Sequence, residues 1–401
     1  MQLNIQHYNE EKLKQDKAAN FNRPYQQCTI SVMDTIADPD ITFDEKGICS
    51  YYYEYQQKEK WFVPEKNEAA AKLAEIIQQI KDAGTGKKYD CITGISGGVD
   101  STYLCLKAKE LGLRPLIVHF DNGWNSELAV KNIEQIIAKL GFDLYTLVVD
   151  WNEFKDLQLA YLKASVVDIE ALTDHAIAGT LYKIAAENNI KCILSGYNIV
   201  TEGILPKHWV FDKSDSANIK DIHKKYGTGS LKTYPLFGLK ERKYFAGVKG
   251  IETVNLLNYL PYNKANVKEI IAKELGWRDY GGKHYESVFT RFYQGYILPV
   301  KFGIDKRKAH LSNLIFSGQL TKAAAIEELA KPIIDDKQLQ EDYTFVLKKL
   351  NLSQQEFETI LTQPRREHTE FATLKSIYKT YPLLKIFRPV VQVARKLGLK
   401  I

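Results

Sequence analysis

The sequence predicts an α/β protein built on a parallel, doubly wound sheet. Short apolar runs rich in β-formers alternate with helical patterns through the middle of the chain. A glycine-rich polar segment directly follows the first of these runs, and helical patterns dominate after residue 260. Alternating short strands and helices indicate a parallel sheet covered on both faces. Ligands of such sheets bind beyond the carboxyl ends of the strands, where this polar segment falls.

The predicted elements follow one another in a simple order. Residues 2–60 read as a polar helix and then an irregular segment rich in Asp, Pro and Tyr. Strands are predicted at residues 89–95, 114–120, 143–149 and 191–195. Helices are predicted at residues 67–84, 101–111, 126–140 and 175–188, and a basic amphipathic stretch at 378–401. We therefore expect an N-terminal segment (1–65), a domain that contains the sheet (66–260) and a mainly helical C-terminal region (261–401).

Composition limits the function classes. The 401 residues carry a formal net charge of +6, with 45% hydrophobic and 26% charged residues, as in an ordinary globular protein. This charge suits an anionic ligand but is too small to argue for nucleic acid. No run is apolar and long enough to span a bilayer or to act as a signal peptide, and five scattered cysteines make no disulfide framework. We expect a cytoplasmic enzyme.

The most informative segment is GISGGVDST, residues 94–102, between a predicted strand and a predicted helix. Gly97 and Gly98 would let backbone N–H groups approach phosphate oxygens, and the helix start adds its positive end. Asp100 would repel bare phosphate, so we expect it to hold Mg²⁺ against the phosphates. The hydroxyl groups available as further donors are those of Ser96, Ser101 and Thr102.

Three other interpretations compete with a phosphate loop. A plain glycine turn with Asp100 or Ser101 as helix N-cap explains one polar residue but not the whole set. The string GISGG also matches the G-x-S-x-G elbow of serine hydrolases, but in that fold several strands precede the nucleophile, and none is predicted upstream of Tyr89. A Walker loop fails because GTGKK, residues 84–88, lacks Ser or Thr after its lysine and precedes a strand.

SGGVDS in this position resembles the signature of the N-type ATP pyrophosphatases, the PP-loop superfamily with a HUP-like fold. GMP synthetase, NAD synthetase and asparagine synthetase are members. The resemblance implies that ATP is cleaved between its α and β phosphates, that the substrate is adenylated on oxygen, and that ammonia displaces AMP.

Longer strings resemble one branch, the N-acetyl sugar amidotransferases of lipopolysaccharide O-antigen and flagellar-glycan biosynthesis. The resembling stretches are residues 28–44, 118–124, 168–177, 195–206 and 282–311, and they cover most of the chain from 23 to 330. The resemblance implies an ATP- and Mg²⁺-dependent enzyme that converts an acetamido group of a nucleotide-activated sugar to an acetamidino group and releases AMP and pyrophosphate.

Candidate nucleotide ligands end the second predicted strand. His119, Asp121 and Asn122 would face ribose and adenine, although His119 can equally be a packed core residue. Lys240 lies in a Pro-Leu…Lys segment that resembles one in the superfamily and could contact phosphate; a solvated lysine is the alternative.

Candidate catalytic and substrate-binding residues lie in the resembling stretches. Before one predicted helix stand four polar residues, Asp168, Glu170, Asp174 and His175. After the fourth strand come Asn198, Thr201 and Glu202. Glu202 is the preferred proton acceptor, and Asp100, Asp174 and His175 complete the catalytic candidates. We assign Asp168, Glu170, Asn198 and Thr201 to substrate binding, and one acidic residue serving only as a helix N-cap is the alternative.

A later string would close over the sugar or its diphosphate. Its candidate residues are Lys283, His284, Glu286 and Arg291. Arginine suits a two-point grip on phosphate or carboxylate. The alternative is a surface helix with an ordinary Glu–Arg pair.

The chain departs from the family near its N-terminus. Relatives carry two paired-cysteine knuckles that resemble a zinc site. In this sequence Cys28 and Cys49 are present, but their partner positions are occupied by Ser31 and Tyr52. Structural zinc wants four Cys or His ligands, so we predict no zinc and expect residues 51–53, all tyrosine, to hold the segment by aromatic packing.

The nitrogen source is argued from what the chain lacks. Residue 2 is Gln, so the Cys nucleophile of an N-terminal glutaminase is missing. We expect ammonia from solution or from a separate glutaminase subunit, no nucleic acid and no membrane span. A homo-oligomer is left open. The alternatives are a PP-loop enzyme that thiolates tRNA and an inactive binding subunit.

Overall fold

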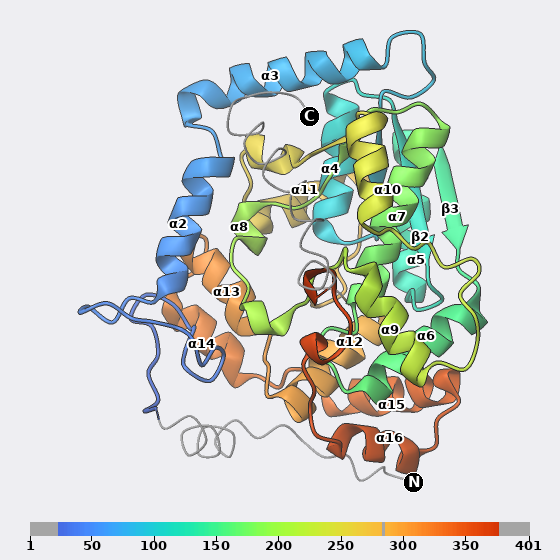
Figure 1. Ribbon diagram of the computed structural model, residues 1–401. Helices are drawn as coiled ribbons and strands as arrows, with labels where there is room; N and C mark the ends of the chain where they lie inside the picture. The colour runs from blue at the N-terminus through green and yellow to red at the C-terminus, as the bar shows by residue number, and fades with distance from the viewer. Residues whose placement is uncertain (1–22, 283–284, 377–401) are drawn as a thin grey trace.

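The fold centres on a five-stranded parallel sheet. In the computed structural model, which describes residues 23–282 and 285–376, the strand order is β3-β2-β1-β4-β5 (Figure 1). The strands are β1 (Cys91–Gly94), β2 (Pro115–Asp121), β3 (Leu144–Val148), β4 (Cys192–Leu194) and β5 (Glu252–Val254). All neighbours pair in parallel, with Ile92 opposite Leu116 on one side and Ile193 on the other. The predicted parallel α/β sheet is confirmed.

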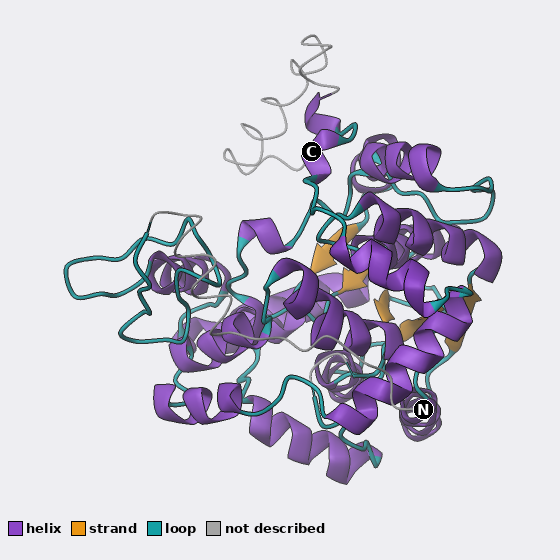
Figure 2. Ribbon diagram, turned by 90° about the horizontal axis from the view of Figure 1, so that it is seen from below, coloured by secondary structure: helices purple, strands orange, loops and turns teal. Residues whose placement is uncertain are grey.

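Helices make up most of the remaining chain (Figure 2). Those of the N-terminal half are α2 (Ser50–Phe62), α3 (Lys66–Ala83), α4 (Val99–Glu110), α5 (Glu127–Leu140), α6 (Trp151–Ala164), α7 (Ala171–Glu187), α8 (Ile199–Glu202), α9 (Ser216–Tyr226) and α10 (Leu239–Lys243). The C-terminal half contributes α11 (Lys264–Leu275), α12 (Val288–Phe292), a π-helix (Tyr293–Phe302), α13 (Arg307–Phe316), α14 (Lys322–Ala330), α15 (Asp336–Leu350) and α16 (Gln354–Thr362). Within the described residues, no helix is long and apolar enough to cross a membrane.

The two faces of the sheet bury separate clusters. On one face, Ile117 of β2 packs with apolar residues of α3, α4, α5 and α11. On the other face, Leu116 and Val118 pack with Ile184 of α7. This alternation along one strand follows from the two-residue period of side chains in β structure. A third and larger cluster joins the N-terminal segment, α2 and α6 to the C-terminal helices.

Several elements differ from the sequence prediction, among them α8, α9 and α10, and three others show why. Helix α2 replaces the expected irregular segment, because Tyr51 and Tyr55 lie one turn apart and are both buried, while the polar residues between them hide the helical pattern. Helix α6 was not predicted, although Asp150 caps it through the N–H groups of Asn152 and Glu153. Strand β5 was missed because it has only three residues, of which Glu252 is exposed. The helix predicted near the N-terminus and the stretch 378–401 lie outside the described residues.

A buried ion pair fastens the N-terminal segment to the C-terminal half. Lys308 of α13 donates to Asp34 at 2.6 Å, and both side chains are almost completely buried. Asp34 also accepts the backbone N–H groups of Ile36 and Ala37, so its charge has several donors. Buried charges persist only when they are paired in this way. The packing of the tyrosines expected at residues 51–53 is also present, since Tyr52 lies edge-on to Phe316 of α13 at 5.6 Å.

Replacing Lys308 by methionine should therefore be strongly destabilising. Lys308→Met leaves the Asp34 carboxylate buried without its cation, which costs about 3–5 kcal/mol. Urea denaturation measures the loss, and the double variant K308M/D34N should recover part of it because no buried charge remains. A loss in K308M no larger than that of an exposed substitution would contradict the ion pair's role.

Candidate functional site

The site lies where the strand order reverses, between β1 and β4. Each of these strands leads at its carboxyl end into a polar loop, residues 95–98 after β1 and 195–198 after β4. In sheets of this kind, the connections that follow two such strands run in opposite directions and leave a crevice between them. Asn198 Nδ2 donates to Asp100 Oδ1 across it at 3.1 Å. The two loops that the sequence singled out therefore meet.

Gly97 has a conformation and surroundings that exclude any side chain. Its φ is +80°, and a Cβ atom there would lie 2.7 Å from the Tyr280 hydroxyl. Its carbonyl accepts hydrogen bonds from Trp277 Nε1 at 2.7 Å and from the Tyr280 hydroxyl at 2.9 Å. Two aromatic residues of the C-terminal half thus hold the loop in a fixed shape.

The start of α4 is arranged to receive an anion. Its N-cap residue is Gly98, which offers no side-chain acceptor to the N–H groups of the first turn. Ser96 and Ser101 lie 3.3 Å apart, Oγ to Oγ, and the Gly98 N–H donates to Ser96 Oγ at 3.2 Å. N–H groups and hydroxyls at a helix N-terminus can bind phosphate, so this geometry is compatible with the predicted phosphate loop. Thr102, the next residue, has a buried hydroxyl without a partner in the described part of the chain.

Asp100 is held by two neutral donors. Besides Asn198, the hydroxyl of Tyr262 donates to the same carboxylate oxygen. Burial, followed by the charge of Asp100 and more weakly that of Glu202, raises the pKa of Tyr262, so the phenol stays protonated. Asn198 in turn caps α8 by accepting from Thr201 N and Oγ1. The predicted residues of this loop are thus brought to Asp100, and Tyr262 joins them from a part of the chain that sequence reasoning missed.

The carboxyl end of β2 forms the next wall of the crevice. His119 donates from Nδ1 to the Ile95 carbonyl at 3.1 Å and accepts from Asn125 Nδ2 at Nε2, at 3.0 Å. Both ring nitrogens are therefore used, and the interpretation of His119 as a packed core residue fits these contacts. Asp121 Oδ1 accepts from Gly123 N and Asn125 Nδ2.

The loop after β2 is clamped from the C-terminal half. Lys349 of α15 donates to the Gly123 carbonyl, and its ammonium lies 4.8 Å from the ring centroids of both Trp124 and Trp151. Burial lowers the pKa of Lys349, but the aromatic faces and the carbonyl favour its cation. Within the same wall, Asn122 Nδ2 donates to Thr173 Oγ1 at 3.2 Å and ties the end of β2 to the start of α7.

An acidic cluster lies at the start of α7, close to Asn122. Lys213 Nζ is 2.7 Å from Asp168 and 3.1 Å from Asp174. Burial alone would lower the pKa of Lys213, but the carboxylates of Asp174 and Asp168 outweigh it and raise that pKa. Desolvation raises the pKa of Asp174, although 53% of its side chain is exposed. Asp174 is therefore an accessible carboxylate with increased proton affinity.

The third acid of this cluster, Glu170, binds other groups. Its carboxylate accepts from Gln294 Nε2 at 2.9 Å and from Lys306 Nζ at 3.2 Å. Neither Lys213 nor Lys306 was among the predicted site residues, although Lys306 lies in the resembling stretch 282–311. The four predicted polar residues do gather at one end of α7. Their carboxylates pair with two lysines that the sequence analysis did not select.

His175 is tied into the fold through both ring nitrogens. Its Nδ1 donates to the Lys213 carbonyl at 2.7 Å, and its Nε2 accepts from Phe237 N at 2.8 Å. Burial lowers its pKa, which keeps the ring neutral. These contacts fit a structural role that holds the 213–237 segment against α7. Its predicted catalytic role has no support from this geometry.

The remaining candidates lie apart from the loop or outside the described residues. Arg291 forms two 2.7 Å hydrogen bonds with Asp342 of α15, so its guanidinium serves a pair within the C-terminal half. Lys240 is exposed on α10. Lys283 and His284 lie outside the described residues. Glu286, in contrast, reaches the loop, since a Cβ atom on Gly98 would lie 3.1 Å from its Oε1.

The cysteines of the degenerate knuckles lie together in the N-terminal segment. Cys28 Sγ accepts the Cys49 N–H at 3.3 Å, and Ser31 Oγ lies 3.8 Å from Cys49 Sγ. The hydrogen bond from the Cys49 thiol lowers the pKa of Cys28, despite its burial. The described residues contain no group of three or more His, Cys, Asp or Glu side chains placed to hold a metal ion.

Comparison with known proteins bears on the C-terminal half. Residues 286–385, which are 100 of the 401, match the family model of the LPS biosynthesis protein WbpG-like, C-terminal domain. The predicted resemblance to proteins of surface-polysaccharide biosynthesis is confirmed. The matched region holds Glu286, Arg291 and Lys349, the last of which clamps the loop after β2.

Other similarities are shorter or weaker. A stretch of 76 residues, 18% of this chain, is 40% identical to tRNA(Ile)-lysidine synthase of Chlamydia pneumoniae and spans 23% of that protein, about a quarter of its length. Among solved structures, NH3-dependent NAD synthetase of Campylobacter jejuni has 15% identity and a TM-score of 0.28 over 53% of this chain and 85% of its own. NMN synthetase of Francisella tularensis has 14% identity and a TM-score of 0.31 over 72% and 98%. Scores this low carry no argument, and the fold class rests on the sheet itself.

Burial of His368 beside the acidic cluster should make the stability of the protein depend on pH. This residue donates from Nδ1 to Asn218 and accepts the N–H of Asp168, and burial lowers its pKa to about 4. Below pH 6.5 the unfolded chain takes up a proton that the folded chain refuses until about pH 4, so the free energy of unfolding falls as pH drops through this window. From pH 7 to pH 5 the expected loss is about 2 kcal/mol.

Urea denaturation of the wild type and of His368→Gln at both pH values measures this term. The variant should be less stable at pH 7 but should lose about 2 kcal/mol less on going to pH 5, because other titrating groups contribute equally to both proteins. Equal losses in the two proteins would show that His368 is not the group responsible.

Proposed function

We propose that this chain is an ATP-dependent amidotransferase that converts an acetamido group of a nucleotide-activated sugar to an acetamidino group. The amide oxygen attacks the α-phosphorus of ATP, pyrophosphate leaves, ammonia adds to the imidate carbon, and AMP departs. The observation that carries the proposal is the loop of residues 96–101 at the β1–β4 crevice, in the same chain as a WbpG-like C-terminal region. The whole reaction is a C–N bond formation driven by ATP.

The loop suits the pyrophosphate half of ATP. The uncapped N–H groups of α4 and the hydroxyls of Ser96 and Ser101 offer neutral donors to a developing negative charge. Asp100, oriented by Asn198 and Tyr262, supplies the hard oxygen ligand that Mg²⁺ prefers beside phosphates. Mg²⁺ held there would offset the charge of the phosphates. The fixed shape of Gly97 keeps these donors in place before ATP arrives.

We assign the proton transfer to one of the predicted carboxylates. The ammonia adduct must lose a proton, and an acceptor with increased proton affinity works best near neutral pH. Asp174 fits this requirement through its raised pKa and its accessibility. Glu202, on α8 behind Asn198, is the second candidate. Asp168 and Glu170, which are less exposed than Asp174, are assigned to binding the sugar.

Thiolation of tRNA is the main competing function. The reason to consider a tRNA substrate is the 76-residue similarity to a tRNA(Ile)-lysidine synthase. Sulfur transfer of the kind considered for this superfamily needs an accessible thiol. All five cysteines of this chain are buried. Burial raises the pKa of Cys91, Cys105 and Cys192, which makes these thiols poor nucleophiles. Cys28, whose pKa is lowered, is also buried, so burial of all five thiols is the observation that favours the amidotransferase.

Nucleotide product analysis tests the proposal. The protein is incubated with ATP, Mg²⁺, ¹⁵N-ammonium and a panel of UDP- and CMP-linked acetamido sugars. AMP and pyrophosphate should appear with one sugar, which gains one ¹⁵N atom in place of oxygen. Asp100→Asn should abolish turnover and Asp174→Asn should reduce it by about 10²-fold, the usual scale for a general base.

The controls separate the parts of the proposal. Lys72→Gln changes an exposed basic residue of α3 that pairs with Glu68, and it should leave turnover unchanged. ADP and phosphate as products would exclude adenylation. Absence of turnover with every sugar, combined with turnover on tRNA, would replace the amidotransferase by the competing function.

A further inference from the structure

The edge strand β3 is exposed in a way that the other strands are not. Within residues 23–282 and 285–376 it pairs only with β2, and Figure 1 shows it as the outermost strand. Leu144, Tyr145 and Val148 are 39%, 44% and 69% exposed, so water reaches both faces of the strand. Helix α6, which follows it, packs against α9 instead of covering it. Strands of a doubly wound sheet are normally buried on both faces.

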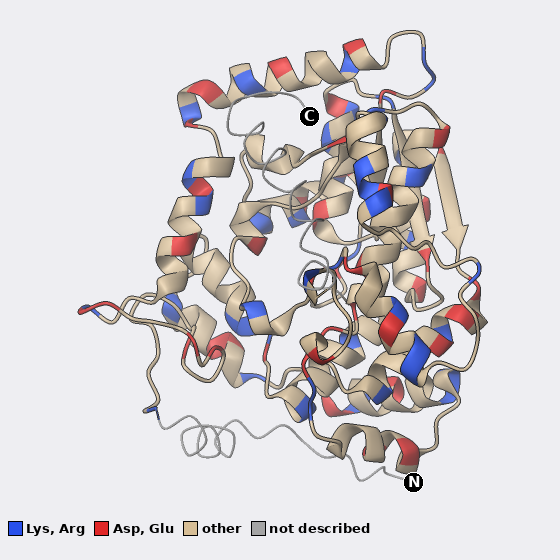
Figure 3. Ribbon diagram, in the orientation of Figure 1, with Lys and Arg blue, Asp and Glu red and all other residues tan. Residues whose placement is uncertain are grey.

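Nothing on β3 protects this edge from another strand. The strand has no charged residue and no proline, and its ribbon is uncharged along its whole length in Figure 3. The opposite edge strand, β5, is only three residues long and begins with the charged Glu252. Short length and charge are the usual protection of edge strands, and only β5 has it.

We propose that β3 is the contact of a homodimer, in which the β3 strands of two copies pair antiparallel about a twofold axis at Thr146. The Asp143 carbonyl and the Val149 N–H both bond to β2. Because backbone groups alternate sides along a strand, the N–H and C=O groups of Leu144, Thr146 and Val148 point to the open edge. These are the groups that a second β3 can bond.

A register centred on Thr146 matches these groups to themselves over the full length of the strand. Thr146 then lies opposite its own copy, and Leu144 lies opposite Val148 of the other chain. Each of these pairs can exchange both of its hydrogen bonds. A shift by one residue would set open-edge groups against groups already bonded to β2, and it would also turn apolar side chains to the wrong face.

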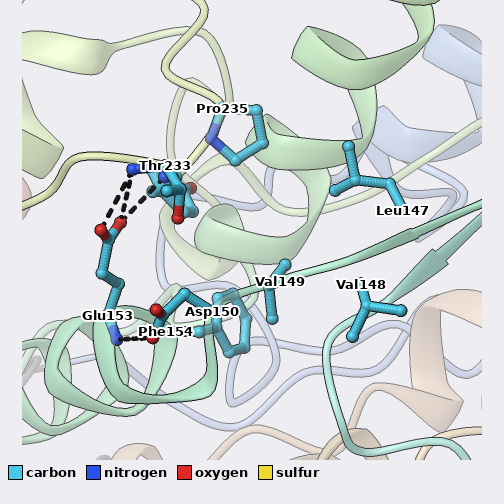
Figure 4. Close-up of a pocket in the computed structure, with 9 residues that line it drawn as sticks. Leu147, Val148, Val149, Asp150, Glu153, Phe154, Thr233 and Pro235 are labelled. Atoms are coloured by element: carbon cyan, nitrogen blue, oxygen red, sulfur yellow. Dashed lines mark hydrogen bonds between the residues drawn. The ribbon is translucent and has the colours of Figure 1, made fainter.

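The same register fills a pocket beside the strand. Leu147, Val149, Phe154 and Pro235 line a hollow between β3, α6 and the 233–235 segment (Figure 4). Tyr145 lies on the same face as Leu147, because side chains alternate with a period of two. Pairing about Thr146 places each Tyr145 opposite Leu147 of the other copy, with its ring within reach of that hollow. The surface is therefore complementary to itself, as a twofold interface requires.

Charges at the two ends of the strand complement each other in this arrangement. Lys88 pairs with Asp143 at the start of β3 and its side chain is well exposed. Asp150 follows the end of the strand. Antiparallel pairing sets the start of one β3 beside the end of the other, so each Lys88 faces Asp150 of the second copy. These arguments favour a second copy of this chain over any other occupant.

Sedimentation of the full chain across a concentration series tests the dimer. The wild type should sediment at twice its 45.9 kDa, and the variant Y145K/V148K should sediment as the monomer with an unchanged circular dichroism spectrum. The matched control is Y244K/V248K, which puts the same two substitutions at exposed residues of similar accessibility outside the sheet. The control should remain dimeric.

Hydrogen exchange keeps the test decisive if the variant fails to fold. In the wild type, the amides of Leu144, Thr146 and Val148 should exchange at least tenfold more slowly at high protein concentration than at low concentration. A wild type that stays monomeric, a dimer that survives Y145K/V148K, or amides whose exchange does not depend on concentration would each overturn the proposal.

Discussion

The hydrogen bonds that orient Asp100 are the constraint on which the site depends. A carboxylate beside an anion-binding loop is unfavourable unless hydrogen-bond donors hold it in place and a cation offsets its charge. Here Asn198, from the loop after β4, and Tyr262, from the segment before α11, both donate to it. These bonds fix the start of α4, α8 and the 262 region relative to one another. They can form only because the strand order reverses between β1 and β4 and brings the two loops to one crevice.

Residues of the C-terminal half complete this site. Trp277 and Tyr280 hold the Gly97 carbonyl, and Lys349 holds the Gly123 carbonyl after β2. The phosphate loop and the β2 loop, which belong to the sheet, therefore depend on residues far along the chain. Lys349 and the Arg291–Asp342 pair that braces α12 against α15 fall in the region that matches the WbpG-like family model.

Local patterns in the sequence predicted the sheet and the phosphate loop. Four strands and the helix start after Gly98 follow from apolar runs, glycines and caps, which act over a few residues. The partners of Asp100 and Asp168 could not be predicted in the same way. Tyr262 and Lys213 meet these carboxylates only in the folded chain, and nothing local marks them as site residues.

The sequence also overestimated how many polar residues are available for chemistry. His175 and Arg291 were selected because their types suit catalysis and anion binding. The fold uses both of them internally, His175 between Lys213 and Phe237, and Arg291 with Asp342. A polar residue that supports the site and one that acts in it carry the same signal in a single sequence. Burial and partners separate them, and both come from the tertiary structure.

Binding of α,β-methylene ATP tests most directly whether the crevice receives the phosphates of ATP. Isothermal titration with and without Mg²⁺ would compare the wild type with Gly98→Ala, whose Cβ would crowd Ser96 Oγ at 3.2 Å and fill space at the loop. Gly247→Ala, at a glycine with open space around it, is the matched control. The account predicts Mg²⁺-dependent binding by the wild type and the control and at least tenfold weaker binding by Gly98→Ala. Equal affinity in all three proteins would contradict it.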